Sequence, residues 1–409
     1  MLSWVNRFSI CCLLDNHRYQ SEYNSYECLV AAGALAVYKA AAGNAINGLH
    51  SFQQQHKDWL FGHLSYDLKN ETEGLTSNHA DGIGFDDLLF FVPRQVIFLS
   101  GNRVEIGTCD DDHQKIFDDI SQTEADEKRI VSKPEIKHRI PKQEYIQSVN
   151  ALKAHILRGD CYEVNYCQEF YAEGCTIQPV FVHQALSKVS PNPFSCYYKV
   201  DDKYLLCASP ERYIKKAGNK VLSQPVKGTS SRNIVDKKLD EQNRIQLTQS
   251  EKDKSENVMV VDLVRNDLSK VCKEGTVKVD ELFGIYTYPQ VHQMISTVSG
   301  ELKENISLAE IIRSTFPMGS MTGAPKRSVL QLIEQYEKTK RGLFSGAVGY
   351  VNPEGDFDFN VVIRSIFYNA SSKYLSYQTG SGITFYCDAE KEYEECLLKA
   401  KAIEQVLGV

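Results

Sequence analysis

Two acidic pairs in the second half of the sequence have the residue types and the spacing to hold a cation. Asp253 and Glu256 are three residues apart in a segment that predicts a helix over residues 253–267, and Glu392 and Glu395 repeat this spacing in a predicted helix over residues 389–407. Each pair shares the apolar face of its helix, which turns toward the protein interior. The four carboxylates could therefore bracket Mg²⁺. Two solvated acidic faces are the alternative, and the spacing alone favours it.

A lysine and a glutamate could meet across a predicted β-hairpin. A turn around Gly218 would place Lys227 opposite Ser209, with Glu211 as its diagonal neighbour on the same face. A lysine that burial keeps neutral can act as a nucleophile, and a nearby glutamate can serve as a general acid. The alternative is an ordinary cross-strand ion pair worth about 0.2–1 kcal/mol, and the positions alone favour it.

Positive and glycine-rich positions near the C-terminus could bind an anion. A predicted continuous strand over residues 357–368 places Arg364 on its polar face, where a guanidinium can bind a carboxylate through two hydrogen bonds. The segment Gly380, Ser381 and Gly382 predicts a turn with exposed backbone N–H groups. Lys399 adds a charge on the second acidic helix. A surface arginine, a flexible turn and a helix ion pair are the alternative.

The elements that must position these residues indicate an α+β fold. Hairpin strands flanked by long helices are typical of that class, and a doubly wound parallel sheet is not. We expect an N-terminal region over residues 1–120, a polar linker or surface excursion over 121–142 and a main region over 143–409. Besides the two helices above, the sequence predicts helices over residues 29–42 and 145–158, and strands over 88–92, 95–99, 204–207, 212–215, 220–227, 346–351 and 374–378.

Composition and charge exclude several classes of protein. The 409 residues are 42% hydrophobic, which suffices for a large core. The net charge is −7 without a basic block, which argues against nucleic acid as a partner. The apolar run at residues 10–14 is short for a signal peptide and far too short to span a membrane. The twelve cysteines are scattered and fit small buried residues in a reducing compartment. We therefore expect a cytoplasmic protein.

Eight sequence segments occur in an order that closely resembles the chorismate-utilising enzymes, which include anthranilate, aminodeoxychorismate, isochorismate and salicylate synthases. The resemblance is strong over residues 140–409 and extends more weakly to GHLSYDLKNE at 62–71. It implies large antiparallel sheets packed face to face, helices outside and a site in a cleft between them. The segments are SPERY (209–213), QPVKGT (224–229), ENVMVVDLVRNDL (256–268), GSMTGAPK (319–326), RGLFSGAVGYV (341–351), IRS (363–365), GSGI (380–383) and EYEECLLKA (392–400).

The resemblance also assigns roles to the candidate residues. It implies Mg²⁺ held mainly by Glu256 and Glu395, with Glu392 and Asp253 nearby. The carboxylates of chorismate would be bound by positive side chains and by backbone N–H groups, in a pocket lined by small residues. The residues implied for substrate binding are Arg364, Lys399, Gly380, Ser381, Gly382, Gly228, Thr229 and Thr322.

Position 227 distinguishes members of the family. Anthranilate synthases carry alanine there, whereas lysine is typical of aminodeoxychorismate synthases. The implied mechanism has Lys227 attack C2 of chorismate while Glu211 protonates the departing C4 hydroxyl; ammonia then attacks C4 and expels the lysine. The product, 4-amino-4-deoxychorismate, leads to para-aminobenzoate and folate. Because no amidotransferase portion is recognisable, a separate glutamine amidotransferase is expected to supply the ammonia.

Two positions depart from the patterns of relatives. Isochorismate and salicylate synthases carry a lysine base where Glu163 stands, which argues against a hydrating enzyme. Relatives often carry histidine where Gln293 stands, with His292 beside it here, and neither residue receives a role. Anthranilate synthase and isochorismate synthase stay open as alternatives. A chorismate-binding scaffold without activity is the non-enzymatic alternative.

Overall fold

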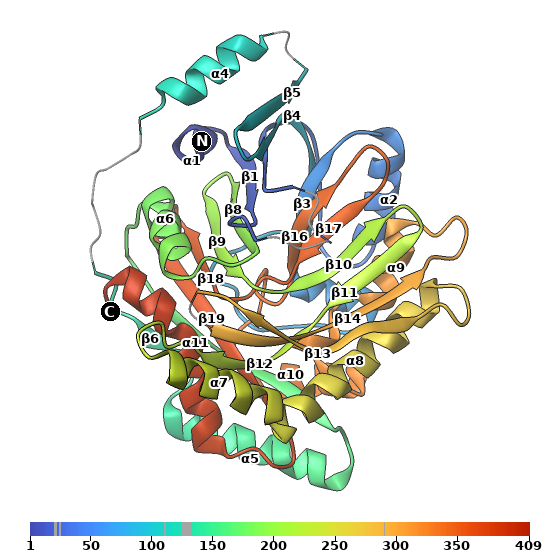
Figure 1. Cartoon of the computed structure of the whole chain (residues 1–409), viewed down its shortest axis with the longest axis vertical. Coiled ribbons are helices and arrows are strands. Elements are labelled where there is room, and N and C mark those ends of the chain that lie inside the picture. Colours follow the sequence, from blue (N-terminus) through green and yellow to red (C-terminus); the bar gives the residue numbers. More distant parts are fainter. Residues whose placement is uncertain (20–22, 24–25, 110–111, 125–132, 290) are drawn as a thin grey trace.

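The strands of this protein form one antiparallel network. The computed structural model describes residues 1–19, 23, 26–109, 112–124, 133–289 and 291–409. Within these residues, nineteen strands are joined by hydrogen bonds, and the strand pairs are antiparallel. The helices lie mainly around the outside of the strands (Figure 1). This arrangement confirms the predicted α+β class and the large antiparallel sheets.

The network divides into two sheets that share the long strands β2 (Cys28–Ala40) and β4 (Leu88–Ser100). The first sheet, as we call it, continues from β2 to its neighbour β1. It ends at β7, whose first residue is Glu163. In order of pairing it contains β5 (Arg103–Thr108), β4, β2, β1 (Ile10–Asp15), β8 (Phe194–Val200), β9 (Lys203–Ser209), β18 (Ser365–Asn369), β19 (Tyr374–Ile383) and β7 (Glu163–Ala172), with β6 (Lys137–His138) and β15 (Gly323–Ala324) also paired to β7.

The second sheet leaves β4 in the other direction. It ends at β14, which pairs with three strands, one of which carries Lys227. In order of pairing it contains β3 (Leu60–Leu64), β16 (Ala347–Val351), β17 (Phe357–Asn360), β10 (Arg212–Ala217), β11 (Lys220–Gln224) and β14 (Val291–Glu301), followed by β12 (Val226–Ser231) and β13 (Lys278–Thr287).

Two long helices cover the ends of these sheets. Helix α8 (Glu251–Val271) packs against β12, β13 and β14, and α11 (Ala389–Leu407) packs against β19. Side-chain caps begin both helices: Ser250 accepts a hydrogen bond from the backbone of α8, and Asp388 does so for α11. The helices predicted over 253–267 and 389–407 are thereby confirmed. The apolar side chains Val260 and Val264 of α8 are buried in the largest core cluster, so the same helix face carries Glu256 inward.

The remaining helices complete the outer layer. The helix predicted over 145–158 is confirmed within α5 (Lys142–Arg158), which packs on α11. None of the helices in the described residues is both long enough and apolar enough to cross a membrane. The other helices are α1 (Leu2–Val5), α2 (Ala45–Gln55), α3 (Lys69–Thr72), α4 (His113–Gln122), α5 (Lys142–Arg158), α6 (Pro179–Val189), α7 (Lys237–Gln249), α9 (Leu308–Thr315) and α10 (Lys326–Tyr336), with short 3₁₀ turns at Tyr66–Leu68 and Gly319–Met321.

The predictions for residues 29–42 and 357–368 are wrong. The alanine-rich segment 29–42 is not a helix but most of strand β2, because pairing with β1 and β4 on its two edges outweighs the helix propensity of alanine. The strand predicted over 357–368 is broken. Its first part, β17, pairs with β10 and β16 in the second sheet, and its last part, β18, pairs with β9 and β19 in the first sheet. The chain crosses between sheets at residues 361–364.

Other sequence predictions have mixed outcomes. The two strands predicted over 88–92 and 95–99 are one strand, β4, and the hairpin between β16 and β17 is confirmed. All twelve cysteines are free, and all but Cys109 are buried. The division into regions stays a prediction, and residues 125–132 of the expected linker lie outside the described part of the chain.

Candidate active site

The far ends of the two sheets bring Lys227 and Glu163 into contact. Lys227 lies on β12 of the second sheet, and its Nζ donates a hydrogen bond to Glu163 Oε1 on β7 of the first sheet at 2.7 Å. The two side chains are only 11% and 2% exposed. Gly382 on β19 lies over the pair, since a Cβ at this position would be 2.8 Å from Glu163 Oε1 and 3.3 Å from Lys227 Nζ. A side chain at position 382 would therefore displace the ends of these two side chains.

Lys227 is an ammonium group in this arrangement. Burial opposes its charge, but the carboxylates of Glu163, Glu256 and Glu211 outweigh burial and raise the pKa of Lys227 above its ordinary value. The prediction that burial alone would keep the amine neutral is wrong, because three acidic groups surround it. A nucleophilic role therefore requires a proton acceptor, and Glu163 is in direct contact.

Glu211 lies near Lys227, but the hairpin pairing that we predicted to bring them together is not formed. The β10–β11 ladder ends at the pair Arg212 and Gln224, and β12 pairs with β14 instead, so Lys227 does not face Ser209 across a hairpin. Pro225 has no N–H group with which to extend that ladder. Burial raises the pKa of Glu211 to about 7, against a hydrogen bond from Ser320 and the nearby charges of Lys227 and Arg364. Near neutral pH this carboxyl group is thus partly protonated.

Arg364 occupies the crossing between the two sheets. Its φ is +52°, an unusual backbone conformation for a residue with a side chain. Desolvation lowers the pKa of Arg364 to about 10, although Tyr288 and Glu211 oppose this shift. The guanidinium forms no hydrogen bond or ion pair with the described residues. We predicted Arg364 on the polar face of a strand, but it lies between β17 and β18. Its donors are nevertheless available for an anionic ligand.

Three of the four predicted metal ligands converge, but they do so around a lysine. Lys252 Nζ lies 3.1 Å from Glu392 Oε1, 3.8 Å from Glu256 Oε1 and 4.0 Å from Glu395 Oε2. Asp253, the fourth predicted ligand, lies against Gly228 on β12: its Cβ would be 3.0 Å from a Cβ placed on that residue. That close contact explains why residue 228 is a glycine.

The carboxyl groups of the acidic cluster have pKa values shifted in opposite directions. Burial, together with Glu163 and Glu395, raises the pKa of Glu256 to about 7, although Lys227 and Lys252 oppose this shift. Burial also opposes charge on Glu395, but Lys399 Nζ at 2.8 Å outweighs burial and lowers the pKa of Glu395. The cluster therefore combines one carboxyl group that titrates near neutral pH with another that stays charged.

The chemistry of this cluster fits a hard divalent cation. Glu256 Oε1 and Glu392 Oε2 are buried without a hydrogen-bond partner among the described residues, an arrangement that is costly for carboxylate oxygens. Oxygen donors of this kind suit Mg²⁺. In the described part of the chain, however, no three acidic, histidine or cysteine side chains are close enough together to bind a metal ion. Lys252 lies between the carboxylates, so ion binding would require this lysine to move.

The segment 380–382 is part of a strand, not a turn. Gly380, Ser381 and Gly382 belong to β19 and pair with β7, so the prediction of a turn is wrong, and anion binding by this segment stays a prediction. The Ser381 hydroxyl is 3.3 Å from the Tyr145 hydroxyl, and both residues are buried. Lys399 Nζ donates a hydrogen bond to the Gly380 carbonyl oxygen at 2.8 Å. Lys399 therefore joins this strand to the acidic cluster.

The remaining predicted residues lie on both sides of the site. Thr322 is buried, and its hydroxyl donates to the carbonyl oxygens of the preceding turn at 3.2 and 3.3 Å. Thr229 is exposed and lies directly opposite Gln293 on β14. Gln293 is fully buried, and its amide oxygen and nitrogen have no partner among the described residues. His292 is held by Thr287 at 2.9 Å and Asp240 at 3.2 Å, and its neighbours suggest a structural role.

Sequence reasoning missed Lys252. The available signal was its position directly before the predicted helix, in what the structure shows to be the first turn of α8, where the helix dipole disfavours a cation. It also left the pairing of Glu163 with Lys227 unassigned. Both contacts depend on how separate elements pack, so residue spacing within one element could not reveal them.

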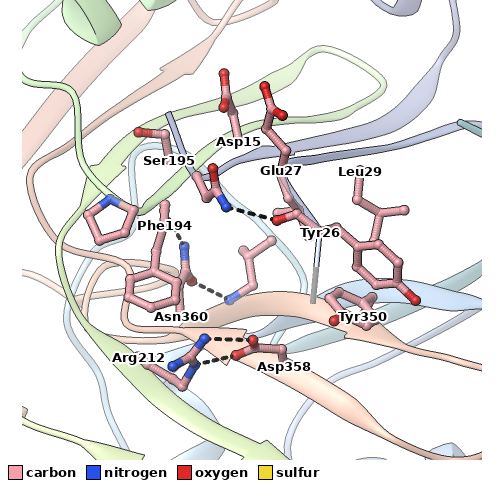
Figure 2. Close-up of a pocket in the computed structure, with 14 residues that line it drawn as sticks. Asp15, Tyr26, Glu27, Leu29, Phe194, Ser195, Arg212, Tyr350, Asp358 and Asn360 are labelled. Carbon is pink, nitrogen blue, oxygen red and sulfur yellow. Dashed lines mark hydrogen bonds and ion pairs between the residues drawn. The ribbon is translucent and has the colours of Figure 1, made fainter. Parts of the chain in front are cut away.

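A separate cavity lies where β1, β2 and β8 meet β10 and β17 (Figure 2). It has a volume of about 70 Å³ and contains a buried ion pair, in which Arg212 donates hydrogen bonds of 2.8 and 3.0 Å to Asp358. Tyr26 and Phe194 form part of its wall. None of the residues predicted for catalysis, metal binding or substrate binding lines this cavity.

Comparison with known proteins supports the order of motifs. The chain matches the family model for chorismate binding enzymes over residues 10–405. An anthranilate synthase component I-like protein of Synechocystis is 34% identical over 359 residues, covering 85% of this chain and 72% of the relative. The aminodeoxychorismate synthase component 1 of Bacillus subtilis is 30% identical over 361 residues, covering 85% of this chain and 76% of the relative. The solved structure of anthranilate synthase component I from Streptococcus pneumoniae shares the fold, with a TM-score of 0.82 and 22% identity over 96% of each chain.

Proposed function

This chain belongs to the family of chorismate-binding enzymes, and within that family we propose that it replaces the C4 hydroxyl of chorismate with an amino group, the reaction of an aminodeoxychorismate synthase. The observation that carries this proposal is the buried contact of 2.7 Å between Lys227 and Glu163, with Glu211 beside it. A lysine at this position supplies a nucleophile. Relatives named as aminodeoxychorismate synthases, including the Bacillus subtilis protein, support the same choice.

Substrate binding would use the positive groups at the crossing of the sheets and on α11. The two carboxylates of chorismate would be bound by Arg364, which has no partner among the described residues, and by Lys399. This placement would bring the substrate ring over Lys227. The desolvation that lowers the pKa of Arg364 would be relieved when a carboxylate pairs with it.

The chemical step begins with loss of a proton from Lys227. Glu163 Oε1 is the acceptor already in contact, and the resulting amine attacks C2 of the ring while both ring double bonds shift toward C4. Glu211, partly protonated near pH 7, donates its proton to the C4 hydroxyl, which leaves as water. Ammonia then attacks C4, both double bonds shift back, and the Lys227 amine is expelled from C2. The net reaction consumes chorismate and ammonia and releases 4-amino-4-deoxychorismate and water.

A metal ion would act next to these residues. Mg²⁺ held by Glu256 and Glu395, with Glu392 and Asp253 nearby, would offset the charge of the ring carboxylate and, by binding Glu256, favour proton loss from Lys227. A glutamine amidotransferase would supply ammonia, in keeping with the word component in the names of relatives. The product would enter para-aminobenzoate and folate synthesis in the cytoplasm.

Product analysis tests the proposal directly. The purified chain, incubated with chorismate, ammonium and Mg²⁺, should form 4-amino-4-deoxychorismate without releasing pyruvate. Anthranilate synthase is the second candidate because of the Synechocystis relative. Fluorescent anthranilate with an equal amount of pyruvate would establish that second activity, and binding of chorismate without any product would indicate an inactive scaffold.

A further inference from the structure

Lys252 lies among carboxylates that come from two helices. It is on α8 with Glu256, whereas Glu392 and Glu395 are on α11. Only the Glu392 contact, at 3.1 Å, is a hydrogen bond; the contacts to Glu256 and Glu395 are 3.8 and 4.0 Å. One oxygen each of Glu256 and Glu392 is left buried without a partner. The ammonium group therefore balances the charge of the cluster but does not satisfy its oxygens.

Interactions within α8 do not explain a lysine at this position. Lys252 lies in the first helical turn, where the positive end of the helix dipole disfavours a cation. Its pairing with Glu256 four residues later is the less favourable order for a lysine and a glutamate. The charge must thus be stabilised by the tertiary contacts with α11. Because the side chain is 48% exposed, it can turn into solvent without passing through the core.

We propose that Lys252 is a tethered counter-ion, which holds the carboxylates of α8 and α11 together when no metal is bound and which a divalent cation displaces. This inference rests on the metal site of the proposed function. A divalent cation can contact several oxygens at once, including those that the ammonium leaves unpaired. Lys252 also accounts for the spacing of the carboxylates, because they surround an ammonium group and not a metal ion.

The proposal predicts how uncharged variants bind metal. In Lys252→Met no ammonium competes for the carboxylates, so Mg²⁺ or Mn²⁺ should bind about tenfold more tightly, as measured by calorimetry. This factor corresponds to the free energy of a partly buried ion pair, which the metal no longer has to break. The metal-free variant should melt at a lower temperature than the wild type, and excess Mg²⁺ should remove most of this difference. Unchanged or weaker metal binding in Lys252→Met would overturn the proposal.

Matched controls separate this effect from a general loss of positive charge. Lys254 is on the same helix but pairs with Glu251 at 3.2 Å, outside the cluster, so Lys254→Met should bind metal like the wild type. Lys252→Arg keeps the charge and should also stay close to the wild type. If Lys254→Met gains as much affinity as Lys252→Met, the effect is one of net charge and the proposal fails.

A measurement on the unaltered protein avoids dependence on variants. If metal displaces Lys252 into solvent, Mg²⁺ should increase acetylation of this residue by an amine-selective reagent, measured by mass spectrometry, while acetylation of Lys254 stays constant. Equal or lower acetylation of Lys252 with Mg²⁺ would overturn the proposal. Failure of the wild type to bind Mg²⁺ at all would instead remove the metal site on which the proposed function depends.

Discussion

Two buried ion pairs on neighbouring parts of the fold differ in how completely they are satisfied. In the first, Arg341 donates to both oxygens of Glu337 at 2.7 and 3.0 Å and to the carbonyl oxygens of Met321 and Asn165 at 2.7 Å. The backbone N–H of Cys167 adds a hydrogen bond of 2.9 Å to Glu337. This pair joins three separate segments of the chain, and its charges have partners in nearly every direction.

The second pair consists of Lys227 and Glu163, and Glu163 lies only two residues before Asn165 along the chain. It has one direct hydrogen bond, and Glu163 Oε2 is buried without a partner among the described residues. A buried polar atom without a partner destabilises a fold, whereas a fully bonded pair holds elements in register. Under the proposed function, the Arg341 pair maintains the structure and the Lys227 pair serves the chemical step. Variants of each pair can test this assignment.

The largest expected effect is on activity at Lys227. Lys227→Ala removes the proposed nucleophile, so kcat for formation of 4-amino-4-deoxychorismate should fall by about a thousandfold or more. Chorismate binding, measured by calorimetry, should change much less, because Arg364 and Lys399 remain. Full activity in this variant would reverse the comparison and leave the pair without a chemical role.

The next effect concerns stability at Arg341. Arg341→Met leaves the Glu337 carboxylate and two backbone carbonyl oxygens buried without their donor, and the free energy of unfolding should fall by about 3–5 kcal/mol in urea denaturation. Glu163→Gln is the matched variant in the other pair. It should lose about 1 kcal/mol or less, because Glu256 and Glu211 still face Lys227. Equal losses in the two variants would contradict the proposed difference between the pairs.

The contrast also separates what the sequence can predict from what it cannot. The helices over 253–267 and 389–407 were predictable because the apolar stripe and the capping residues Ser250 and Asp388 are local features. Strand partners are not local: Gln224 and Val226, on either side of Pro225, pair with different strands. The family resemblance brought the site residues together in one proposal, although their spacing alone did not.

The contacts made by these residues required three-dimensional packing. Glu256 was predictable as an inward carboxylate from its own helix, but nothing within that helix indicates that Lys252 bonds to Glu392 on α11. Likewise, Arg364 was predicted as a residue able to bind a carboxylate, but it was placed on a continuous strand that does not exist. Residue type was thus more predictable than the conformation that presents it.

A smaller effect on activity should follow from changes at Glu211. Glu211→Gln removes the proton that we assign to the departing hydroxyl, so kcat should fall by about a hundredfold. In the wild type, kcat should decline as pH rises above 7, because the pKa of Glu211 is about 7 and only the protonated form is a general acid. The variant should lack this decline. A variant profile identical to that of the wild type would assign the acid role to another group.

The smallest expected effect is the contribution of Glu211 to stability as pH changes. Its pKa rises from 4.5 to about 7 on folding, mainly through burial, so between these values the folded protein binds more protons than the unfolded chain. The stabilisation is present in full below the unfolded pKa and is lost as pH rises through the folded value. From about pH 5 to about pH 8, the free energy of unfolding should therefore fall by about 2.5 kcal/mol more in the wild type than in Glu211→Gln. Urea denaturation in the presence of EDTA measures this difference without a contribution from metal binding. Parallel curves would mean that Glu211 stays charged in the folded protein, and its buried site would then resemble the fully compensated Arg341 pair.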